Sequence, residues 1–327
     1  MFRFVVLAAL FLSGVFVAAQ ENTVRLQIGW LPQSQFAGIL VAEQKGFFAK
    51  YIPNRKIEVS WSQVTESPLD KLHGDTEDFC LAWLPDALLH RCIQGKEKNV
   101  CLMQVFQNTP LMLVTRTNSG IKKPSDLDGK QVQVWRGDLG FMMRTFFKTQ
   151  NIKPVPVPQN DSMQPFIYGA VPVASALYFN EYHTLLERGI PETELRTFRL
   201  SDYGLDFPGD GIYCKAELWK SDSKLCKGVI QAVRDGWSFA AAPENEMETL
   251  AVVMKYVRKA DVITNVSHQR WMLRTIRSDL HVDSADWGQL KQADFDRIAA
   301  VIKKSGELEP EQAEKIPVFN DFFTGQH

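Results

Sequence analysis

The chain has 327 residues, of which 45% are hydrophobic and 23% are charged, and its formal net charge is −1. This composition is that of a globular protein, and the balanced charge excludes the basic surplus with which a protein attracts nucleic acid or an anionic lipid surface. Chains of this length usually divide into domains of about 100 to 150 residues, so the length predicts two lobes.

The N-terminus has the features of a removable export signal. Arg3 precedes an unbroken apolar run over residues 4–12, and a stretch of small residues ends at Ala19, where signal peptidase would cut. The run is too short to span a bilayer, no later stretch reaches the roughly 18 to 20 apolar residues of a membrane helix, and no cysteine at the cleavage site could carry a lipid. We therefore expect residues 1–19 to be a signal peptide and the mature chain to be soluble.

The first part of the mature chain alternates apolar strands with helical stretches, which is the pattern of an α/β fold. Phe36, Ile39, Leu40 and Phe47 recur at helical spacing, and Gly46 stands where a helix would stop. Strands are predicted over residues 24–30, 56–61 and 78–83, and further helices over residues 68–72 and 86–94.

A second unit of the same kind follows. Residues 96–107 are interpreted as an insertion that precedes it. The unit itself is predicted to have strands over residues 111–115, 131–135 and 173–178, a helical turn over 124–127, a helix over 139–150, a proline-rich stretch over 154–158 and a helix near Met163.

The last third becomes helical, with helices predicted over residues 225–241, 244–257, 268–277 and 295–304. These helices need a surface to pack on, and the first lobe is the simplest one. The chain would then cross between lobes twice, near residues 108–110 and near Asp202, which makes a hinge. Lobe 1 is accordingly predicted to contain residues 20–109 and 203–327, and lobe 2 residues 110–202.

Five cysteines in an exported chain permit disulfides and leave at least one thiol unpaired. Cys214 and Cys226 bracket a short stretch with turn signals and are the favoured pair. Cys92 and Cys101 flank a polar segment and form a second candidate pair, which leaves Cys80 in a strand as a small hydrophobe. The spacing leaves the connectivity open.

Several segments, in order along the chain, resemble the SsuA/THI5-like family of periplasmic substrate-binding proteins, which bind thiamine pyrimidine precursors or aliphatic sulfonates. The resemblance covers most of the chain, from Trp30 to about Gly306. The matching segments are Gly29–Pro32 with Phe36–Gly38, Ala42–Phe48, Gly74–Phe79, Ser119–Lys130, and Tyr178–Tyr182 followed by Gly189.

The resemblance implies a type II periplasmic binding protein fold, with two Rossmann-like α/β lobes joined by a two-segment hinge. It also implies a monomer in the periplasm that captures a small molecule, has no cofactor, and delivers its ligand to the membrane permease of an ABC transporter. One departure is Val171–Ala174, where the family usually has a Val-Asp-Ala step. The eukaryotic branch, which makes the thiamine pyrimidine by consuming its own histidine, matches poorly because Ala82–Asp86 stands where that histidine is expected.

Three tryptophans are candidates for ligand contact. Trp30, Trp83 and Trp135 each fall at the end of a predicted strand, where open α/β lobes bind ligands. An indole face stacks on a flat heteroaromatic ring and attracts a cation, which suits a pyrimidine-like ligand. The alternative is that each tryptophan closes the core. The resemblance adds Phe36, which lies in the family's opening segment.

Polar candidates follow two of the strands. Arg136, Gly137 and Asp138 form a turn into a helix whose free N–H groups could receive an anion or a ring acceptor. Arg136 could equally be a solvated arginine. Asn180 and Glu181 follow a strand of the second lobe. The carboxylate of Glu181 could accept from an exocyclic amine, and Asn180 offers both a donor and an acceptor, although Asn180 could instead cap a helix.

Tyr203 and Asp206 lie at the second predicted crossing, where ligand contact and lobe closure are both plausible roles. Sequence motifs for metal or nucleophilic catalysis are missing, which predicts that the protein is not an enzyme and holds no metal. Surface or structural roles account for the histidines, which are His73, His90, His183, His268, His281 and His327.

The sequence therefore predicts a solute-binding protein for a heteroaromatic molecule such as a thiamine pyrimidine precursor. Three alternatives stay open. The ligand could be a sulfonate or another small anion, which would favour backbone and hydroxyl donors over stacked tryptophans. The chain could be a synthase-like enzyme, or a sensory component that presents its closed form to a membrane receptor.

Overall fold

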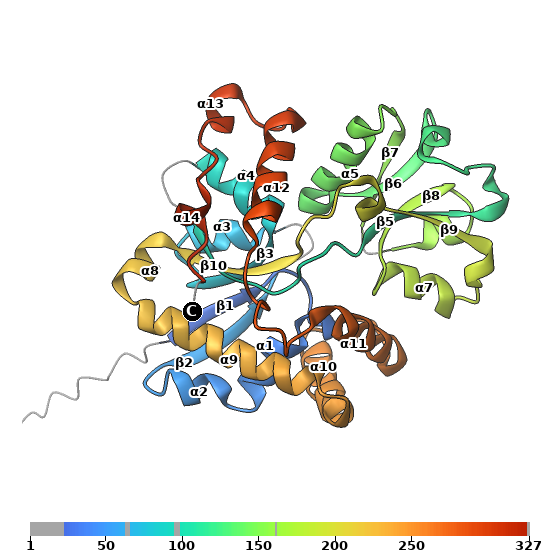
Figure 1. Ribbon diagram of the computed structural model, residues 1–327. Helices are drawn as coiled ribbons and strands as arrows, with labels where there is room; N and C mark the ends of the chain where they lie inside the picture. The colour runs from blue at the N-terminus through green and yellow to red at the C-terminus, as the bar shows by residue number, and fades with distance from the viewer. Residues whose placement is uncertain (1–22, 63–65, 95–98, 161, 326–327) are drawn as a thin grey trace, which may run out of the picture.

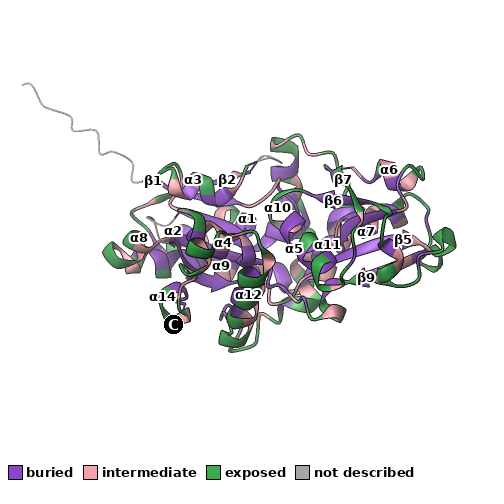
Figure 2. Cartoon of the chain, turned by 90° about the horizontal axis from the view of Figure 1, so that it is seen from above, coloured by how far each residue is buried: buried purple, intermediate pink, exposed green. Residues whose placement is uncertain are grey.

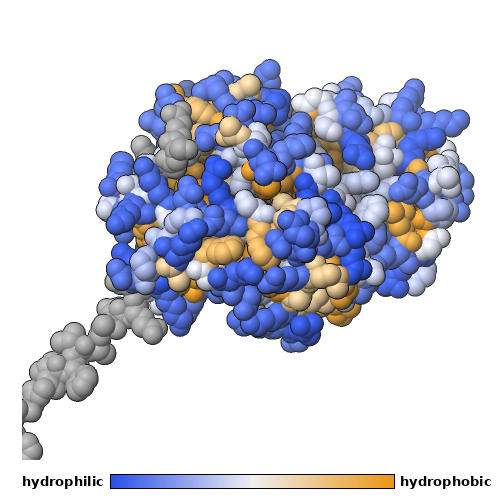
Figure 3. Space-filling view, turned by 60° about the horizontal axis from the view of Figure 1, so that its bottom comes forward, coloured by the Kyte–Doolittle hydropathy of each residue, from blue (hydrophilic) through white to orange (hydrophobic). Residues whose placement is uncertain are grey.

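The computed structural model describes residues 23–62, 66–94, 99–160 and 162–325. The predicted signal peptide, residues 1–19, lies outside the described residues. Within the described part, no helix combines the length and the apolar character that crossing a membrane requires. On the face shown in Figure 3, hydrophobic side chains form separate small patches among hydrophilic ones.

Two five-stranded mixed sheets, each with its own helices, form two lobes side by side (Figure 1). The first sheet has the order β2-β1-β3-β10-β4 and the second has the order β7-β6-β8-β5-β9. The strands of the first sheet are β1 (Thr23–Ile28), β2 (Lys56–Trp61), β3 (Phe79–Trp83), β4 (Asn99–Gln104) and β10 (Asp210–Lys215). Those of the second are β5 (Leu111–Arg116), β6 (Gln131–Trp135), β7 (Val155–Gln159), β8 (Val173–Leu177) and β9 (Leu195–Arg199).

The two sheets share one pattern of strand directions. In the first, β2, β1 and β3 are parallel and β10 runs antiparallel to both β3 and β4. In the second, β7, β6 and β8 are parallel and β5 runs antiparallel to both β8 and β9. The predicted two-lobed α/β architecture is confirmed, and so is the prediction that the second lobe resembles the first.

Helices cover the faces of both sheets, and buried residues concentrate in the strands and on the helix faces turned toward them (Figure 2). The C-terminal helices pack on the first lobe, as predicted (Figure 1). Helices of the N-terminal half are α1 (Ala37–Gln44), α2 (Phe47–Tyr51), α3 (Pro68–His73), α4 (Leu84–Gln94), α5 (Gly137–Thr149), α6 (Gln164–Ile167) and α7 (Glu181–Glu187). Those that follow are α8 (Ala216–Ser221), α9 (Ser223–Ala241), α10 (Glu246–Lys259), α11 (Val266–Leu280), α12 (Gln292–Ser305), α13 (Pro310–Ala313) and α14 (Phe319–Phe322).

Two chain segments connect the sheets, one from β4 to β5 and one from β9 to β10. A hydrogen bond joins them, because the backbone N–H of Thr109 donates to Asp206 Oδ1 at 2.7 Å. Arg297, on α12, donates to the backbone carbonyl of Asp206. Tyr203, on the second segment, packs edge-to-face on Phe146 of α5 with ring centroids 5.2 Å apart.

Four strands were not predicted. The proline-rich stretch forms the edge strand β7, in which Val155 N donates to Lys130 O while Pro156 and Pro158 occupy alternate positions that need no donor. β4 lies inside the segment interpreted as an insertion, and its polar ends Asn99 and Gln104 are buried. The residues of the other two, β9 and β10, were interpreted only as part of the segment that brings the chain back from lobe 2 to lobe 1.

The predicted disulfides are wrong. All five cysteines are free and buried. The Sγ atoms of Cys214 and Cys226 lie 4.0 Å apart, about twice the length of a disulfide bond, so this favoured pair is adjacent but not bonded. Cys92 lies in α4 and Cys101 in β4, each as a buried apolar side chain. Cys80 is buried in β3, as predicted.

Helices α1 and α9 cross at two glycines. A Cβ added at Gly236 would overlap the carbonyl oxygen of Gly38, and one added at Gly38 would overlap the ring of Trp237. Trp237 is fully buried and belongs to the main core of lobe 1. The absence of side chains at this crossing therefore sets how closely α9 approaches the first sheet.

We expect Gly236→Ala to lower the free energy of unfolding by about 1–3 kcal/mol, because the added methyl group forces the two helices apart. Urea denaturation followed by circular dichroism measures this. Ser238→Ala, at an exposed position of the same helix, is the matched control and should change stability by less than about 0.5 kcal/mol. Equal stabilities of the two variants would contradict the close crossing.

Candidate ligand-binding site

A cleft of about 420 Å³ lies between the lobes and is lined from both of them. Its walls come from the carboxyl ends of parallel strands, since Trp30 follows β1, Trp83 ends β3 and Trp135 ends β6. Loops at this edge of an α/β sheet are the usual place for ligands. Eight of the eleven predicted ligand-binding residues line the cleft, namely Trp30, Phe36, Trp83, Trp135, Arg136, Gly137, Asn180 and Glu181.

Two tryptophans meet across the cleft. The rings of Trp30, from lobe 1, and Trp135, from lobe 2, pack edge-to-face with centroids 5.7 Å apart and an interplanar angle of 87°. Trp135 is only 8% exposed, and its Nε1 has no hydrogen-bond partner among the described residues. A buried donor without a partner costs free energy, so this N–H is suited to a ligand acceptor. Phe36, only 1% exposed, belongs mainly to the core.

A chain of buried polar side chains forms the lobe 1 floor of the cleft. Gln33 Nε2 donates to Gln35 Oε1 at 2.6 Å, and Gln35 Nε2 donates to Asp210 Oδ2 at 2.6 Å. Asp210 is 1% exposed and begins β10. None of the three was predicted as a site residue, although Gln33 and Gln35 lie between the two family-like stretches Gly29–Pro32 and Phe36–Gly38.

The lobe 2 side of the cleft contains a buried carboxyl group. Glu181 Oε2 accepts from the backbone N–H of Leu177 at 2.8 Å, and Glu181 Oε1 accepts from Asn180 Nδ2 at 2.8 Å. Burial raises the pKa of Glu181 to about 7, against the opposing effect of these hydrogen bonds. Asn180 is at the N-cap of α7, but its side chain makes no capping bond. Its Oδ1 instead lies 2.9 Å from Nε2 of His268 in lobe 1.

Acidic side chains outnumber basic ones around the cleft. Glu66 and Asp70 have partners nearby, Lys71 at 3.5 Å and His90 at 2.8 Å respectively. Arg136, the one cation among the described lining residues, is exposed at the N-terminus of α5, where no side chain caps the free N–H groups. The carboxylates among the described lining residues are Glu66, Asp70, Asp86, Glu181 and Asp210.

Three predicted site residues do not appear in the cleft lining. The side chain of Asp138 lies outside the described part of the structure. Tyr203 and Asp206 lie at the second crossing segment, against Phe146 and Thr109 respectively. Contact of these three residues with a ligand stays a prediction.

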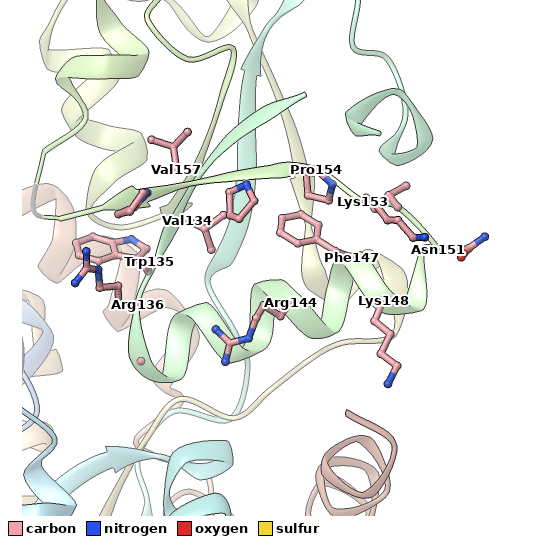
Figure 4. A pocket seen from close by; sticks show the side chains of 14 residues that line it. Val134, Trp135, Arg136, Arg144, Phe147, Lys148, Asn151, Lys153, Pro154 and Val157 are labelled. Carbon is pink, nitrogen blue, oxygen red and sulfur yellow. The ribbon is translucent and has the colours of Figure 1, made fainter. Parts of the chain in front are cut away.

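A second hollow, of about 700 Å³, lies between α5 and β7 of lobe 2 (Figure 4). Phe147 points from α5 toward Pro154, while Arg144 and Lys148 point to the other side of the helix. Both cations contact lobe 1: Arg144 Nε lies 2.6 Å from Glu307 Oε1, and Lys148 Nζ donates to Lys304 O at 2.9 Å. This hollow is larger than the cleft, but all its lining residues come from one lobe and its walls are mostly apolar.

The family described as NMT1/THI5 like matches residues 33–246, more than half of the chain. No curated protein sequence matches the chain. Several solved structures are similar in fold.

The alkanesulfonate-binding protein SsuA from Xanthomonas axonopodis pv. citri, bound to MOPS, superposes with a TM-score of 0.66 at 11% identity, over 94% of this chain and 100% of that one. The ligand-binding component of an ABC-type import system from Staphylococcus aureus, with zinc bound, gives 0.63 at 11% identity, over 93% and 96%. The periplasmic aliphatic sulphonate-binding protein SsuA from Escherichia coli gives 0.60 at 13% identity, over 77% and 82%. The predicted periplasmic binding protein fold is confirmed.

The raised pKa of Glu181 predicts a specific pH dependence of stability. The carboxyl group ionises near its ordinary value of 4.5 in the unfolded chain and near 7 in the folded one. Between these values the folded state binds more protons, so the free energy of unfolding falls as pH rises, by up to about 3 kcal/mol, and then levels off.

Glu181→Gln should remove this fall, because an amide does not titrate. Urea denaturation of both proteins from pH 4.5 to pH 8 gives the comparison, and Glu217→Gln, at an exposed position, controls for the substitution itself. If the wild type and Glu181→Gln depend on pH in the same way, the buried carboxyl group does not titrate as described.

Proposed function

Because the chain belongs to the NMT1/THI5-like family, we propose that it is a solute-binding protein that captures an amine-bearing heteroaromatic molecule, of the thiamine pyrimidine precursor class, between its lobes. The observation that carries this proposal is the acidic character of the cleft. Among the described lining residues, five acidic side chains stand against one arginine, although Glu66 and Asp70 have partners in Lys71 and His90 and the pKa of Glu181 is about 7. A carboxylate attracts an amine or a protonated ring and repels a sulfonate.

The cleft walls suit a flat ring. Trp30 and Trp135 present one ring face and one ring edge at right angles, so a heteroaromatic ligand can stack on one indole and meet the other at its edge. Asp210 and Glu181 lie in the cleft lining on opposite lobes and can accept from an exocyclic amine. The unpartnered Nε1 of Trp135 can donate to a ring nitrogen.

The transport role rests on the fold. Structures with this fold include the binding component of an ABC-type import system and a periplasmic sulphonate-binding protein. By analogy we propose that this protein works in the periplasm and delivers its ligand to a membrane permease. A synthase that consumes its own histidine fits the cleft less well, because the described lining residues include no histidine.

A sulfonate is the second candidate ligand, and three sources of hydrogen-bond donors favour it. Arg136, the free N–H groups at the start of α5 and Nε1 of Trp135 are donors on the same side of the cleft. Similar structures include two sulfonate-binding proteins. We place this candidate second because Asp210 and Glu181 face the same space, where an anion would lie close to carboxylates.

Titration calorimetry distinguishes the two ligands. We expect a 4-aminopyrimidine to bind more tightly than an alkanesulfonate, and Trp135→Ala or Trp30→Ala to weaken its binding about tenfold or more, because stacking of a base on an aromatic ring is worth about 1–3 kcal/mol. Trp61→Phe is the control, since Trp61 is not among the described lining residues of the cleft and its ring lies under Lys259.

Asp210→Asn keeps an acceptor for Gln35 and removes only the charge. We expect it to weaken binding of the aminopyrimidine and to leave sulfonate binding unchanged or stronger. Preferential binding of the sulfonate by the wild type, weakened by Arg136→Ala, would overturn the assignment.

A further inference from the structure

The lobes also meet at a cluster of two histidines and a glutamate beside the cleft. His183 and Glu187 are four residues apart on α7 of lobe 2 and so share one face of the helix. His268 is in the first turn of α11, which packs on lobe 1. Nδ1 of His183 lies 2.9 Å from Nδ1 of His268, which lies 3.5 Å from Oε2 of Glu187.

We propose that His183, Glu187 and His268 form a binding site for a divalent transition metal of the zinc class that joins the two lobes. One ligand atom from each residue lies within 4.8 Å of the others. Tetrahedral zinc bonds imidazole nitrogen and carboxylate oxygen at about 2.0–2.2 Å, which places neighbouring ligand atoms about 3.4 Å apart. The separation of 3.5 Å already fits this value, and the separation of 2.9 Å must widen by about 0.5 Å. The ligand atoms of His183 and Glu187 lie within 4.8 Å of each other.

The surrounding residues orient all three ligands. His268 Nε2 faces the amide oxygen of Asn180 at 2.9 Å, so Nε2 carries the proton and the Nδ1 lone pair points into the cluster. Glu187 Oε1 accepts from Asn265 Nδ2 at 3.2 Å, which leaves Oε2 for the metal. The ring of His183 stacks on Trp271 with centroids 4.5 Å apart and an interplanar angle of 13°.

The site would have three protein ligands and one open position. Zinc sites with three protein ligands take water or another small ligand in the fourth position. In the absence of metal, Nδ1 of His183 carries a proton and donates a hydrogen bond to Nδ1 of His268. A bound metal takes the place of that proton. The sequence did not indicate the site because His183 and His268 are 85 residues apart.

Zinc titration of the full chain, without a polyhistidine tag and freed of metal with a chelator, tests the site. Calorimetry should show one zinc ion per chain, and cobalt should give the visible absorption of a tetrahedral complex. His183→Gln, from lobe 2, and His268→Gln, from lobe 1, should each weaken zinc binding at least about 100-fold, because loss of a ligand exceeds the 10–100-fold cost of losing an outer partner.

His90→Gln is the matched control, since His90 stacks on His73 at 4.6 Å and contacts Asp70, yet lies outside the cluster. Its zinc affinity should equal that of the wild type. Thermal melting without metal identifies any variant that fails to fold, and Glu187→Gln provides a further test because this side chain is 29% exposed and tolerates an isosteric change. The proposal fails if the wild type binds no zinc at micromolar concentration, or if folded Glu187→Gln and either folded histidine variant bind it as the wild type does.

Discussion

The carboxyl ends of the parallel strands in both sheets turn toward the same gap, and the rest of the site depends on this arrangement. It places Trp30, after β1, and Trp135, at the end of β6, in edge-to-face contact with ring centroids 5.7 Å apart, although the two residues are 105 positions apart in the sequence. It also brings Asp210 and Glu181 to opposite walls of one cleft. Because each lobe contributes only part of the lining, the complete site exists only when the lobes are together.

Polar contacts between the lobes flank the cleft. On one side, Asn180 and His183 of lobe 2 meet His268 of lobe 1. On the other side, Arg144 and Lys148 of α5 reach the end of α12. Polar contacts of this kind are typical of interfaces between domains of one chain. Asn180 belongs both to the cleft lining and to the histidine cluster.

The sequence predicted the elements whose burial follows a simple pattern and missed those set by tertiary contacts. β2 and β6 have the predicted bounds because their apolar residues alternate or run continuously between clear breaks. β7 was missed because its prolines are tolerated only at a sheet edge, which the sequence does not reveal. The tryptophans of the cleft lining were predicted as site candidates from their place after strands. Asp210 was not predicted, since its contact with Gln35 spans 175 residues. The histidine cluster depends on the same kind of long-range contact.

The identity of the molecule that the protein retains from its host tests the central claim most directly. Denaturation of the purified protein releases that molecule, and mass spectrometry identifies it. The charge of the cleft and its two tryptophans predict an aminopyrimidine or a similar amine-bearing heteroaromatic base at close to one per chain. Recovery of a sulfonate or another anion in that amount would contradict the account, because five acidic side chains line the space it would occupy.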